Sequence, residues 1–328
     1  MNADWANFLK TNNFKFPEDT NTSSNINADR NSISALPYLT CIEVTGTDAS
    51  TFLQGQLSCD INRLTESNSF FSAFCNAKGR TITTFIIIKT TSGFLLVLPA
   101  ELIDKVIKKL QMYILRSDVQ VKDMSDQLCI LGVNTLSADT LENAPIEAFS
   151  IYQNKNIYIK LPLNSHRYLV ISDPAQAITL WTHLTTNSHF IVNTAESWAE
   201  NDLSAGVPWL TLETTEQFIP QMLNIDKLGG ISFNKGCYTG QEIIAKTHYL
   251  GKVKRELFLA YCDRIENITT DTQIITDNNE QVVGKILSLQ NNGQQTKLLI
   301  VIQSSDSELK NLRLNNSNQD RINIIDFH

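Results

Sequence analysis

The sequence pattern changes after His248, and that change restricts the fold more than any other feature of the chain. Downstream, short apolar runs follow one another with no helical periodicity between them: KRELFLAYC, TQIIT, QVVGKILSLQ, KLLIVIQ and RINIIDF. Turn signals at residues 277–279 and at Asn292-Gly293 separate some of these runs. Short strands joined by tight turns predict a small β-barrel, or a β-sandwich, as a separate domain at residues 249–328.

Upstream of His248, predicted helices and strands alternate. Three strand-like runs, FFSAFCNA, TITTFIIIK and FLLVLP, are separated by turn signals at Lys78 and Ser92, which predict antiparallel hairpins. Residues 101–115 place their apolar side chains on one face of a helix, and a second helix is expected at 174–184. This mixture of elements makes the fold class α+β.

The N-terminal residues contain little that predicts a packed domain. Residues 20–32 are rich in Asn, Ser, Thr and Asp, which is typical of a mobile segment. Trp5, Phe8 and Leu9 precede it and predict a short docking helix. We therefore expect residues 1–34 to form a flexible N-terminal segment.

The composition argues against several classes of protein. The formal net charge of −7 does not favour a broad electrostatic contact with nucleic acid or anionic lipid. No apolar run reaches the ~18 residues of a membrane span, and the first residues resemble neither a signal peptide nor a transit peptide. The six cysteines form no C-x-x-C pair and the histidines show no metal spacing. We therefore expect reduced thiols, no resident metal and a cytoplasmic location.

The stretch FNKGCYTGQE, residues 233–242, is the strongest candidate for a reactive site. Thr239 and Glu242 have the spacing of a capping box and predict a helix that begins after Cys237. The dipole of that helix and the positive charge of Lys235 would lower the pKa of the Cys237 thiol and favour a reactive thiolate. The alternative hypothesis is a buried structural cysteine, because free cysteines are usually buried and inert.

Three further features are candidate binding elements. The stretch from 203 to 237 is long, loop-like and rich in Pro and Gly, and such segments are more often functional than not. Trp198 is suited to stacking on a flat aromatic ligand, although a core tryptophan is an equally good interpretation. Lys78 and Arg80 place two cations on a hairpin turn, where either solvent or an anionic ligand tail would be their partner.

Four motifs occur together in the order found in one known family. They are FLQGQLSCD (52–60), CNAKGR (75–80), the stretch from AGVPWL to SFN (205–234) and KGCYTGQE (235–242). Together they resemble the YgfZ family of folate-binding proteins, called tRNA-modifying protein in bacteria, whose hallmark is K-G-C-Y-x-G-Q-E. The resemblance extends from about residue 35 to the β domain.

The resemblance implies a fold similar to that of the T-protein of the glycine cleavage system, a folate-dependent aminomethyltransferase. Three domains would then surround a central channel in which folate binds. We expect a T-protein-like α+β folate-binding body at 35–125 and 185–248, a second α+β domain at 126–184 and a β-barrel at 249–328.

Two departures from the T-protein pattern argue against the T-protein reaction. Where T-proteins carry an acidic pair after the hairpin turn, this chain has Thr83 and Thr84, and a hydroxyl cannot replace a carboxylate base near neutral pH. The stretch that carries a pterin-binding glutamate in T-proteins is replaced here by HRYLVIS (166–172). We therefore do not expect aminomethyl transfer from glycine.

The resemblance also implies site residues. Folate contact in the family is attributed to two tryptophans, of which Trp198 matches one; Leu39, next to Tyr38, stands where the other is expected. Lys78 and Arg80 are the candidate contacts for the anionic end of the ligand. The family's motif cysteine is implicated in iron–sulfur cluster maintenance, so Cys237 is the expected functional thiol. Its supporting motif residues are Lys235, Gly236, Tyr238, Gly240, Gln241 and Glu242.

The primary hypothesis is a folate-binding accessory protein that supports iron–sulfur cluster assembly or maintenance in client enzymes through the thiol of Cys237. Its cofactor would be tetrahydrofolate or a derivative, and its clients would include the enzyme that methylthiolates tRNA. One alternative is a folate-dependent one-carbon transferase or demethylase acting on an unknown small donor. Another is a folate-sensing partner with an inert cysteine. We expect a cytoplasmic monomer that contacts neither nucleic acid nor membranes directly.

Overall fold

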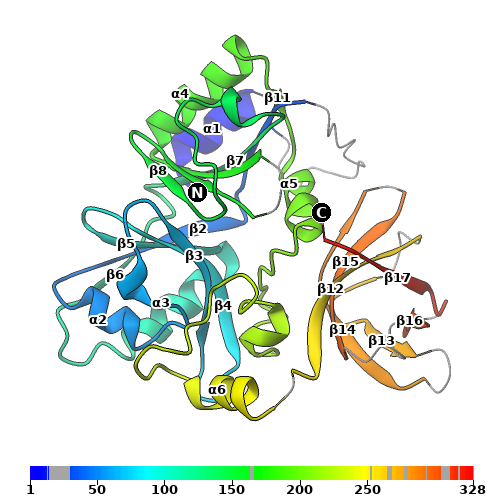
Figure 1. Ribbon diagram of the computed structural model, residues 1–328. Coiled ribbons are helices and arrows are strands. Elements are labelled where there is room, and N and C mark those ends of the chain that lie inside the picture. Colours follow the sequence, from blue (N-terminus) through cyan, green and yellow to red (C-terminus); the bar gives the residue numbers. More distant parts are fainter. Residues whose placement is uncertain are drawn as a thin grey trace.

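The computed structural model describes residues 1–12, 14, 30–162, 166–251, 253–263, 268–276, 280–292, 294–303, 311–316 and 318–327. Within these ranges, three β-sheets are arranged around a central helix, α5 (Ala195–Ser204) (Figure 1). One sheet has five strands, another has six, and the third closes into a barrel. The predicted α+β class and small C-terminal β-barrel are therefore confirmed.

The five-stranded sheet is antiparallel, with the order β3-β4-β5-β2-β6. Its strands are β2 (Leu39–Thr45), β3 (Ser69–Cys75), β4 (Thr81–Lys89), β5 (Gly93–Pro99) and β6 (Gln120–Asp123). The two hairpins β3–β4 and β4–β5 form where the turn signals predicted them. Helices α2 (Ala49–Gln54) and α3 (Ile103–Gln111) pack against this sheet, and α3 buries Val106 and Leu110. The amphipathic pattern of α3 thus places its apolar face on the sheet and its lysines outward.

The six-stranded sheet has the order β11-β1-β7-β10-β9-β8, with β1 and β11 parallel. Its strands are β1 (Ser32–Ala35), β7 (Cys129–Thr135), β8 (Ile151–Gln153), β9 (Ile157–Lys160), β10 (His166–Ser172) and β11 (Ile191–Val192). Strand β10 is buried on both faces, and its side chains alternate between two cores. Leu169 and Ile171 join the core shared with the five-stranded sheet, whereas Tyr168 and Val170 face a second core under two helices. Strands β1 and β11 come from outside the range 126–184 predicted for this domain.

The N-terminal helix is part of that second core. Helix α1 (Ala3–Thr11) is capped by the side chain of Asn2 and packs on α4 (Pro174–Thr182). Trp5 and Leu9 are buried, and the Trp5 ring meets the edge of Trp181 at 5.6 Å between centroids. The predicted docking helix is confirmed. Residues Ala3–Thr11 and the start of β1, which were predicted to belong to a flexible segment at 1–34, are instead packed; residues 13 and 15–29 lie outside the described residues.

The C-terminal barrel closes in the order β12-β15-β14-β13-β16-β17. Its strands are β12 (Arg255–Cys262), β13 (Gln273–Thr276), β14 (Val282–Asn291), β15 (Thr296–Gln303), β16 (Leu312–Leu314) and β17 (Arg321–Ile325). Ala260 and Ile300 point into the barrel core, whereas Leu259 and Val301 point outward into the core shared with the five-stranded sheet. The barrel is therefore joined to the body by apolar packing. The turns predicted at 277–279 and at Gly293 lie outside the described residues.

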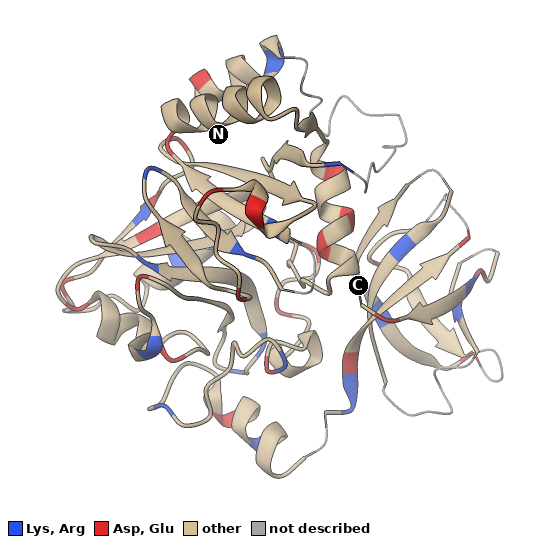
Figure 2. Ribbon diagram, turned by 45° about the horizontal axis from the view of Figure 1, so that its top comes forward, with Lys and Arg blue, Asp and Glu red and all other residues tan. Residues whose placement is uncertain are grey.

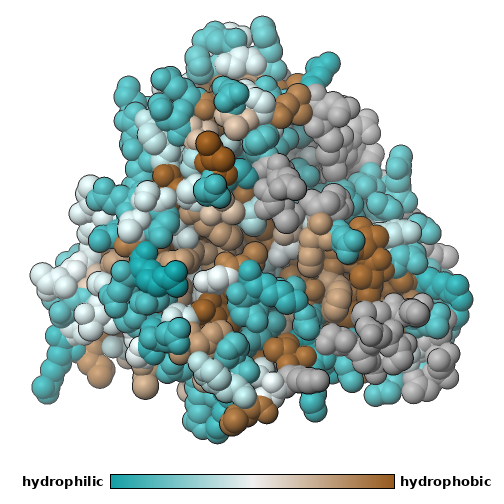
Figure 3. Space-filling view, viewed as in Figure 1, coloured by the Kyte–Doolittle hydropathy of each residue, from teal (hydrophilic) through white to brown (hydrophobic). Residues whose placement is uncertain are grey.

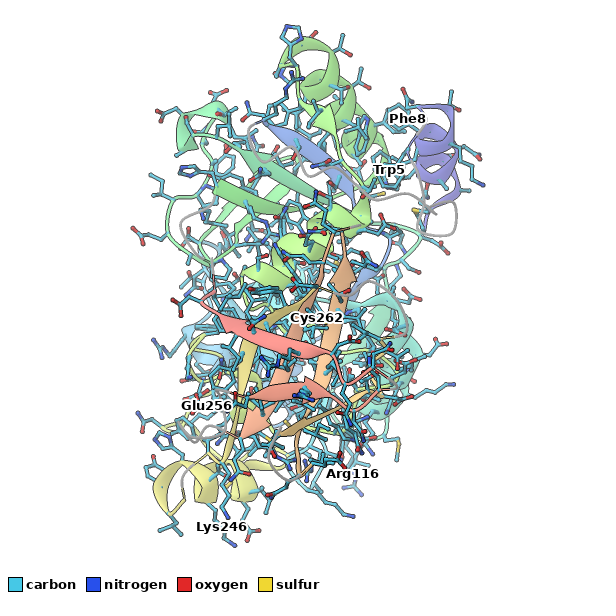
Figure 4. The ribbon with its side chains drawn as sticks, turned by 90° about the vertical axis from the view of Figure 1, so that its right-hand side faces the viewer. Trp5, Phe8, Arg116, Lys246, Glu256 and Cys262 are labelled. Atoms are coloured by element: carbon cyan, nitrogen blue, oxygen red, sulfur yellow. The ribbon has the colours of Figure 1, made fainter. Side chains whose placement is uncertain are left out.

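The remaining elements are short or peripheral. Helical turns occur at Ile61–Arg63, Ala100–Leu102, Ala138–Thr140, His183–Asn187 and Pro220–Leu223. The last helix, α6 (Gln241–Tyr249), carries Lys246 at the opposite end of the molecule from Trp5 and Phe8 of α1 (Figure 4). None of the helices described is long and apolar enough to cross a membrane.

Candidate functional site

Cys237 differs from the other five cysteines because its side chain is exposed. The buried cysteines are Cys41, Cys59, Cys75, Cys129 and Cys262. Burial raises the pKa of the Cys59 thiol to about 11 and that of the Cys75 thiol to about 12, so both stay protonated near neutral pH. A thiol must be accessible and ionised to act as a nucleophile or metal ligand. Cys237 is therefore the thiol that an external partner can reach.

The loop that carries Cys237 is anchored to the segment that follows α2. The Nζ of Lys235 donates hydrogen bonds to the backbone oxygens of Leu57, at 2.8 Å, and of Cys59, at 2.7 Å. The same ammonium group lies 5.0 Å from the centre of the Tyr238 ring. Burial lowers the pKa of Lys235 to about 8, which still leaves the group mostly protonated near neutral pH. These contacts fix the chain on both sides of Cys237.

The tip of the β3–β4 hairpin, Asn76–Arg80, packs against the same loop. A Cβ atom added to Gly240 would lie 2.5 Å from the backbone oxygen of Asn76 and 2.9 Å from the Cα of Gly79. Gly240 also has a φ of +83°, a conformation that glycine adopts much more easily than other residues. A Cβ atom on Gly236, by contrast, would meet no described atom within 4 Å. The hairpin therefore requires glycine at 240, while the space beside Gly236 is open.

The start of helix α6 lacks the capping box that was predicted from Thr239 and Glu242. Its N-cap residue is Gly240, and no side chain caps it. The Thr239 hydroxyl instead donates to Oε1 of Gln56 at 3.1 Å, and Glu242 forms an exposed ion pair with Lys246 at 2.6 Å. The predicted capping box was wrong, because a tertiary contact with the segment after α2 takes the hydroxyl that would have capped the helix.

The two cations predicted on the hairpin turn, Lys78 and Arg80, lie at the tip of the β3–β4 hairpin, which packs against the loop that carries Cys237. Arg80 donates from a guanidinium nitrogen to the backbone oxygen of Gln217 at 2.6 Å, and Lys78 is exposed at the tip. Asn76 donates from Nδ2 to Oε1 of Glu216 at 2.7 Å. Segments at 55–59 and 76–80, far apart in the sequence, thus contact the motif that contains Cys237, and residues 216–217 hold the hairpin from its other side.

A separate cavity of about 310 Å³ lies beside α5, where the five-stranded sheet and the barrel approach each other. Its walls are largely apolar, with a few polar groups. The lining residues are Tyr38, Pro99, Glu101, Ala195, Glu196, Ala199, Asp202, Leu203, Val207, Trp209, Leu210, Thr211, Ser288 and Gln290. A small cavity with aromatic faces and few polar groups is typical of a site for a flat organic ligand.

One wall of this cavity is a hydrogen-bonded network centred on Asp202. Its carboxylate forms a buried ion pair with Arg167 and accepts hydrogen bonds from the Tyr38 hydroxyl, at 3.2 Å, and from Nε1 of Trp209, at 3.0 Å. The guanidinium of Arg167 lies 4.3 Å from the centre of the Trp198 ring. Burial and the charge of Asp202 raise the pKa of Tyr38 well above its usual value, so its phenol remains a hydrogen-bond donor. The network holds the rings of Tyr38 and Trp209 in place on the cavity wall.

Glu196 is the other buried carboxylate on the cavity wall. Both of its oxygens are buried, and neither has a hydrogen-bond partner among the described residues. Acidic residues follow one another along α5, and the helix has no basic residue (Figure 2). Of these residues, Asp202 is paired with Arg167 and Glu200 with Lys297, whereas the oxygens of Glu196 are covered by surrounding protein atoms.

Of the four residues predicted to contact folate, Lys78 and Arg80 are not among the residues that line this cavity, and Trp198 and Leu39 lie behind or beside it. Trp198 is 3% exposed, below Arg167, and its ring is so close to β7 that a Cβ atom on Gly132 would lie 2.3 Å from it. Leu39 is buried and borders a smaller cavity near Trp5, whereas its neighbour Tyr38 lines the cavity beside α5. Neither Trp198 nor Leu39 is among the lining residues of the larger cavity.

Sequence reasoning missed Glu196, Asp202 and Trp209 as cavity residues. A signal was present, because Glu196, Ala199 and Leu203 share one face of a helix by the three- and four-residue spacing. Trp209 lies within the AGVPWL motif but has no periodic context that would place it.

The two threonines at the positions of the T-protein acidic pair are buried in β4. The Thr84 hydroxyl donates to the backbone oxygen of Pro208 at 2.7 Å, and the Thr83 hydroxyl donates to the backbone oxygen of Thr84 at 2.9 Å. Pro208 lies between two cavity-lining residues, Val207 and Trp209. The threonines therefore position the cavity wall.

Across the described ranges, no three side chains of His, Cys, Asp and Glu gather in a way that would hold a metal ion. Cys237 therefore has no companion ligands within this part of the chain.

The fold and the cavity beside α5 place the protein in the T-protein-like class. Residues 11–155 match the family model of the GCVT N-terminal domain. The solved structure of the glycine cleavage system aminomethyltransferase T from Bartonella henselae superposes with a TM-score of 0.70. It is 14% identical and covers 90% of this chain and 85% of its own, which shows the shared fold alone. The predicted T-protein-like fold is thus confirmed.

The tRNA-modifying protein YgfZ of Colwellia psychrerythraea is a closer relative in sequence. It is 32% identical over 283 residues, which cover 83% of this chain and 85% of that protein. The chain belongs to the YgfZ family.

Proposed function

We propose that this protein is a folate-binding accessory factor that supports iron–sulfur cluster assembly or maintenance in client enzymes through the thiol of Cys237. The observation that carries the proposal is the exposure of Cys237 on a loop held by two distant segments, 55–59 and 76–80, while the other cysteines are buried. The name of its relative from Colwellia supports a role in tRNA modification. The proposed clients include the enzyme that methylthiolates tRNA, so the effect on tRNA is indirect.

The thiol of Cys237 is proposed to bind an iron–sulfur cluster only transiently. A thiolate is a soft ligand that suits iron, and a single cysteine holds an iron–sulfur cluster only while a partner supplies the remaining ligands. Apolar residues in and directly after α6, the helix that follows Cys237, are exposed: Ile243 is 39% and Leu250 84% exposed. Hydrophobic side chains are visible at the bottom of the molecule in Figure 3, where α6 lies in Figure 1. Exposed apolar groups next to a functional group are typical of a protein contact surface. The protein is proposed to act as a monomer in the cytoplasm, where exposed thiols stay reduced.

Tetrahydrofolate or a derivative is the proposed ligand of the cavity beside α5. The residues present fit a flat ring, because the aromatic side chains of Tyr38 and Trp209 lie on a largely apolar wall. Trp198 would support this site from behind, through Arg167 and Asp202. A bound reduced folate would supply a carrier for one-carbon units. Cys237 does not line the cavity, so thiol and ligand act at separate places on the protein.

The cluster content of a client tests this proposal. The tRNA methylthiotransferase is purified from a deletion strain complemented with wild type, Cys237→Ser or Gly236→Ala at equal protein levels, and its iron and sulfide are measured. Cys237→Ser should yield a client depleted in cluster. Gly236→Ala, which changes the adjacent residue and keeps the thiol, should match wild type. Full cluster content with Cys237→Ser would remove the thiol from the mechanism.

A further inference from the structure

We propose that the exposed side of α6 is the docking surface for the iron–sulfur client, and that the matching surface of the client has an apolar centre and an acidic rim. We call this docking surface the α6 face. Its residues are Lys78, Ile243, Tyr249, Leu250, Lys254 and Arg255. The inference rests on the proposed function of Cys237, and it adds the chemistry of the partner that has to reach this thiol.

The first step of the argument is that the outward side of α6 is apolar. Ile244 is the buried residue of this helix, whereas its neighbour Ile243 and the residue that ends the helix, Leu250, are exposed. Ile243 and Leu250 are seven positions apart, which is about two turns, so they lie on the same side of the helix. A helix as short as α6 gains most of its stability by packing apolar side chains, so a group of exposed ones marks a surface that a partner covers.

The second step connects this apolar side to the loop that carries the thiol. The rings of Phe233 and His248 are stacked, with 3.7 Å between their centroids and 14° between their planes. Tyr249 meets the His248 ring at 4.8 Å, edge to face, and is 63% exposed. Ile243, at the other end of the helix, packs on the hairpin tip, because its Cβ lies 3.0 Å from the position of a Cβ atom added to Gly79. Both ends of the thiol loop are therefore bordered by apolar groups, and a partner that covers these groups also approaches the thiol.

The third step is the charge that accompanies the apolar groups. The two acidic residues between 241 and 256 are each paired with a lysine, Glu242 with Lys246 and Glu256 with Lys227. Basic residues are visible on α6 and at the start of β12 in Figure 2. The exposed cations without a carboxylate partner among the described residues are Lys78, Lys254 and Arg255. On a protein with a net charge of −7, this positive rim is complementary to an acidic surface on a partner.

The apolar centre and the positive rim together identify the occupant as a protein. A nucleic acid would satisfy the rim, but its phosphates do not cover exposed aliphatic side chains. A second copy of this chain in a symmetric dimer would bring the same cations together. A client has to approach Cys237 to use its thiol, so it lies against the α6 face when it does so.

The experiment measures binding of the purified tRNA methylthiotransferase by isothermal titration calorimetry at low and at high salt. The variants are Leu250→Ser and Lys254→Glu, and the matched controls are Leu136→Ser and Lys155→Glu, exposed residues after β7 and between β8 and β9. Leu250→Ser should weaken binding about tenfold or more at both salt concentrations. Lys254→Glu should weaken it mainly at low salt, because salt screens exposed charges. The controls should bind as wild type does, and every variant should alkylate Cys237 at the wild-type rate, which shows that the thiol loop is intact.

Another occupant of the α6 face would be recognised by two further measurements. A wild-type dimer that Leu250→Ser converts to monomers in sedimentation would assign the face to a second copy. Binding of wild type to phosphatidylglycerol vesicles or to tRNA that Lys254→Glu abolishes would assign it to a lipid surface or to a nucleic acid. Each of these results overturns the inference, as does equal binding of the client by wild type and Leu250→Ser, or no binding by wild type.

The iron and sulfide content of the same client, purified from the complemented deletion strain, distinguishes this inference from the proposed function. If Leu250→Ser and Cys237→Ser both deplete the cluster, the docking surface and the thiol function both stand. If Cys237→Ser alone depletes it, the docking surface is wrong while the thiol function stands. If Leu250→Ser alone depletes it, the docking surface stands and the thiol function fails. If neither variant depletes it, both fail.

Discussion

Two glycines of the motif, Gly240 and Gly236, should respond in opposite ways to the same substitution. Gly240→Ala would place a Cβ atom 2.5 Å from the backbone oxygen of Asn76 and 2.9 Å from the Cα of Gly79, at a φ of +83°. The left-handed conformation costs an alanine about 1–2 kcal/mol, and overpacking adds about 1–3 kcal/mol. We therefore expect Gly240→Ala to lower the free energy of unfolding by about 2–5 kcal/mol.

Gly236→Ala is the matched control. Its Cβ atom would meet no described atom within 4 Å, and its φ is not in the left-handed region. Replacing such a glycine restricts the unfolded chain, so stability should stay the same or rise by about 0.4–1 kcal/mol. Both variants keep the thiol of Cys237 and the charge of Lys235.

The assay is equilibrium urea unfolding followed by tryptophan fluorescence, together with the alkylation rate of Cys237 in the native protein. Gly240→Ala should unfold at lower urea and alkylate at a changed rate, because the hairpin no longer holds the loop in place. Gly236→Ala should match wild type in both measurements. Equal effects of the two substitutions, or a change below about 0.5 kcal/mol for Gly240→Ala, would refute the packing argument.

Three further predictions follow from burial. Iodoacetamide should label native protein at Cys237 alone, as read by peptide mass spectrometry; fast labelling of a second cysteine would contradict the burial described. The free energy of unfolding should fall above pH ~9, because the folded chain keeps the protons of Cys59 and Cys75 up to pKa values of about 11 and 12 while the unfolded chain loses them. The buried thiols of Cys41 and Cys129 act in the same direction, and each thiol contributes about 1.4 kcal/mol per pH unit above pH ~9. Lys235, whose pKa is lowered to about 8, opposes one of the four, so urea unfolding at pH 9 and pH 10 should show a net fall; a rise would show that these thiols ionise in the folded protein. Arg167→Met should lower the free energy of unfolding by about 3–5 kcal/mol, because it leaves a buried carboxylate unpaired; an unchanged urea midpoint would mean that the ion pair is not formed in solution.

Local patterns in the sequence were sufficient for most of the elements. The hairpin of β3 and β4, the amphipathic helix α3 and the strands of the barrel each depend on periodicity and turn residues within a few positions. Trp5 and Leu9 identified a docking helix for the same reason. The identity of Cys237 as the candidate thiol rested on its motif, and the structure adds its exposure.

Tertiary contacts explain what the sequence did not reveal. The capping box failed because the Thr239 hydroxyl is engaged by Gln56, which is distant in the chain. The cavity beside α5 is formed by segments from four parts of the sequence, so the helical spacing of Glu196, Ala199 and Leu203 indicated a shared face but not the segments that it meets, and Trp209 had no local signal at all. Trp198, chosen for its aromatic ring, is instead packed beneath Arg167 in the core.

The most direct test of the central claim is the methylthio-adenosine content of tRNA in a deletion strain. The strain is complemented with wild type, Cys237→Ala or Gly236→Ala at matched protein levels, and nucleosides are quantified by mass spectrometry. Wild type and Gly236→Ala should restore the modification, whereas Cys237→Ala should leave it at the level of the deletion. Full restoration by Cys237→Ala would contradict a thiol-dependent function for this protein.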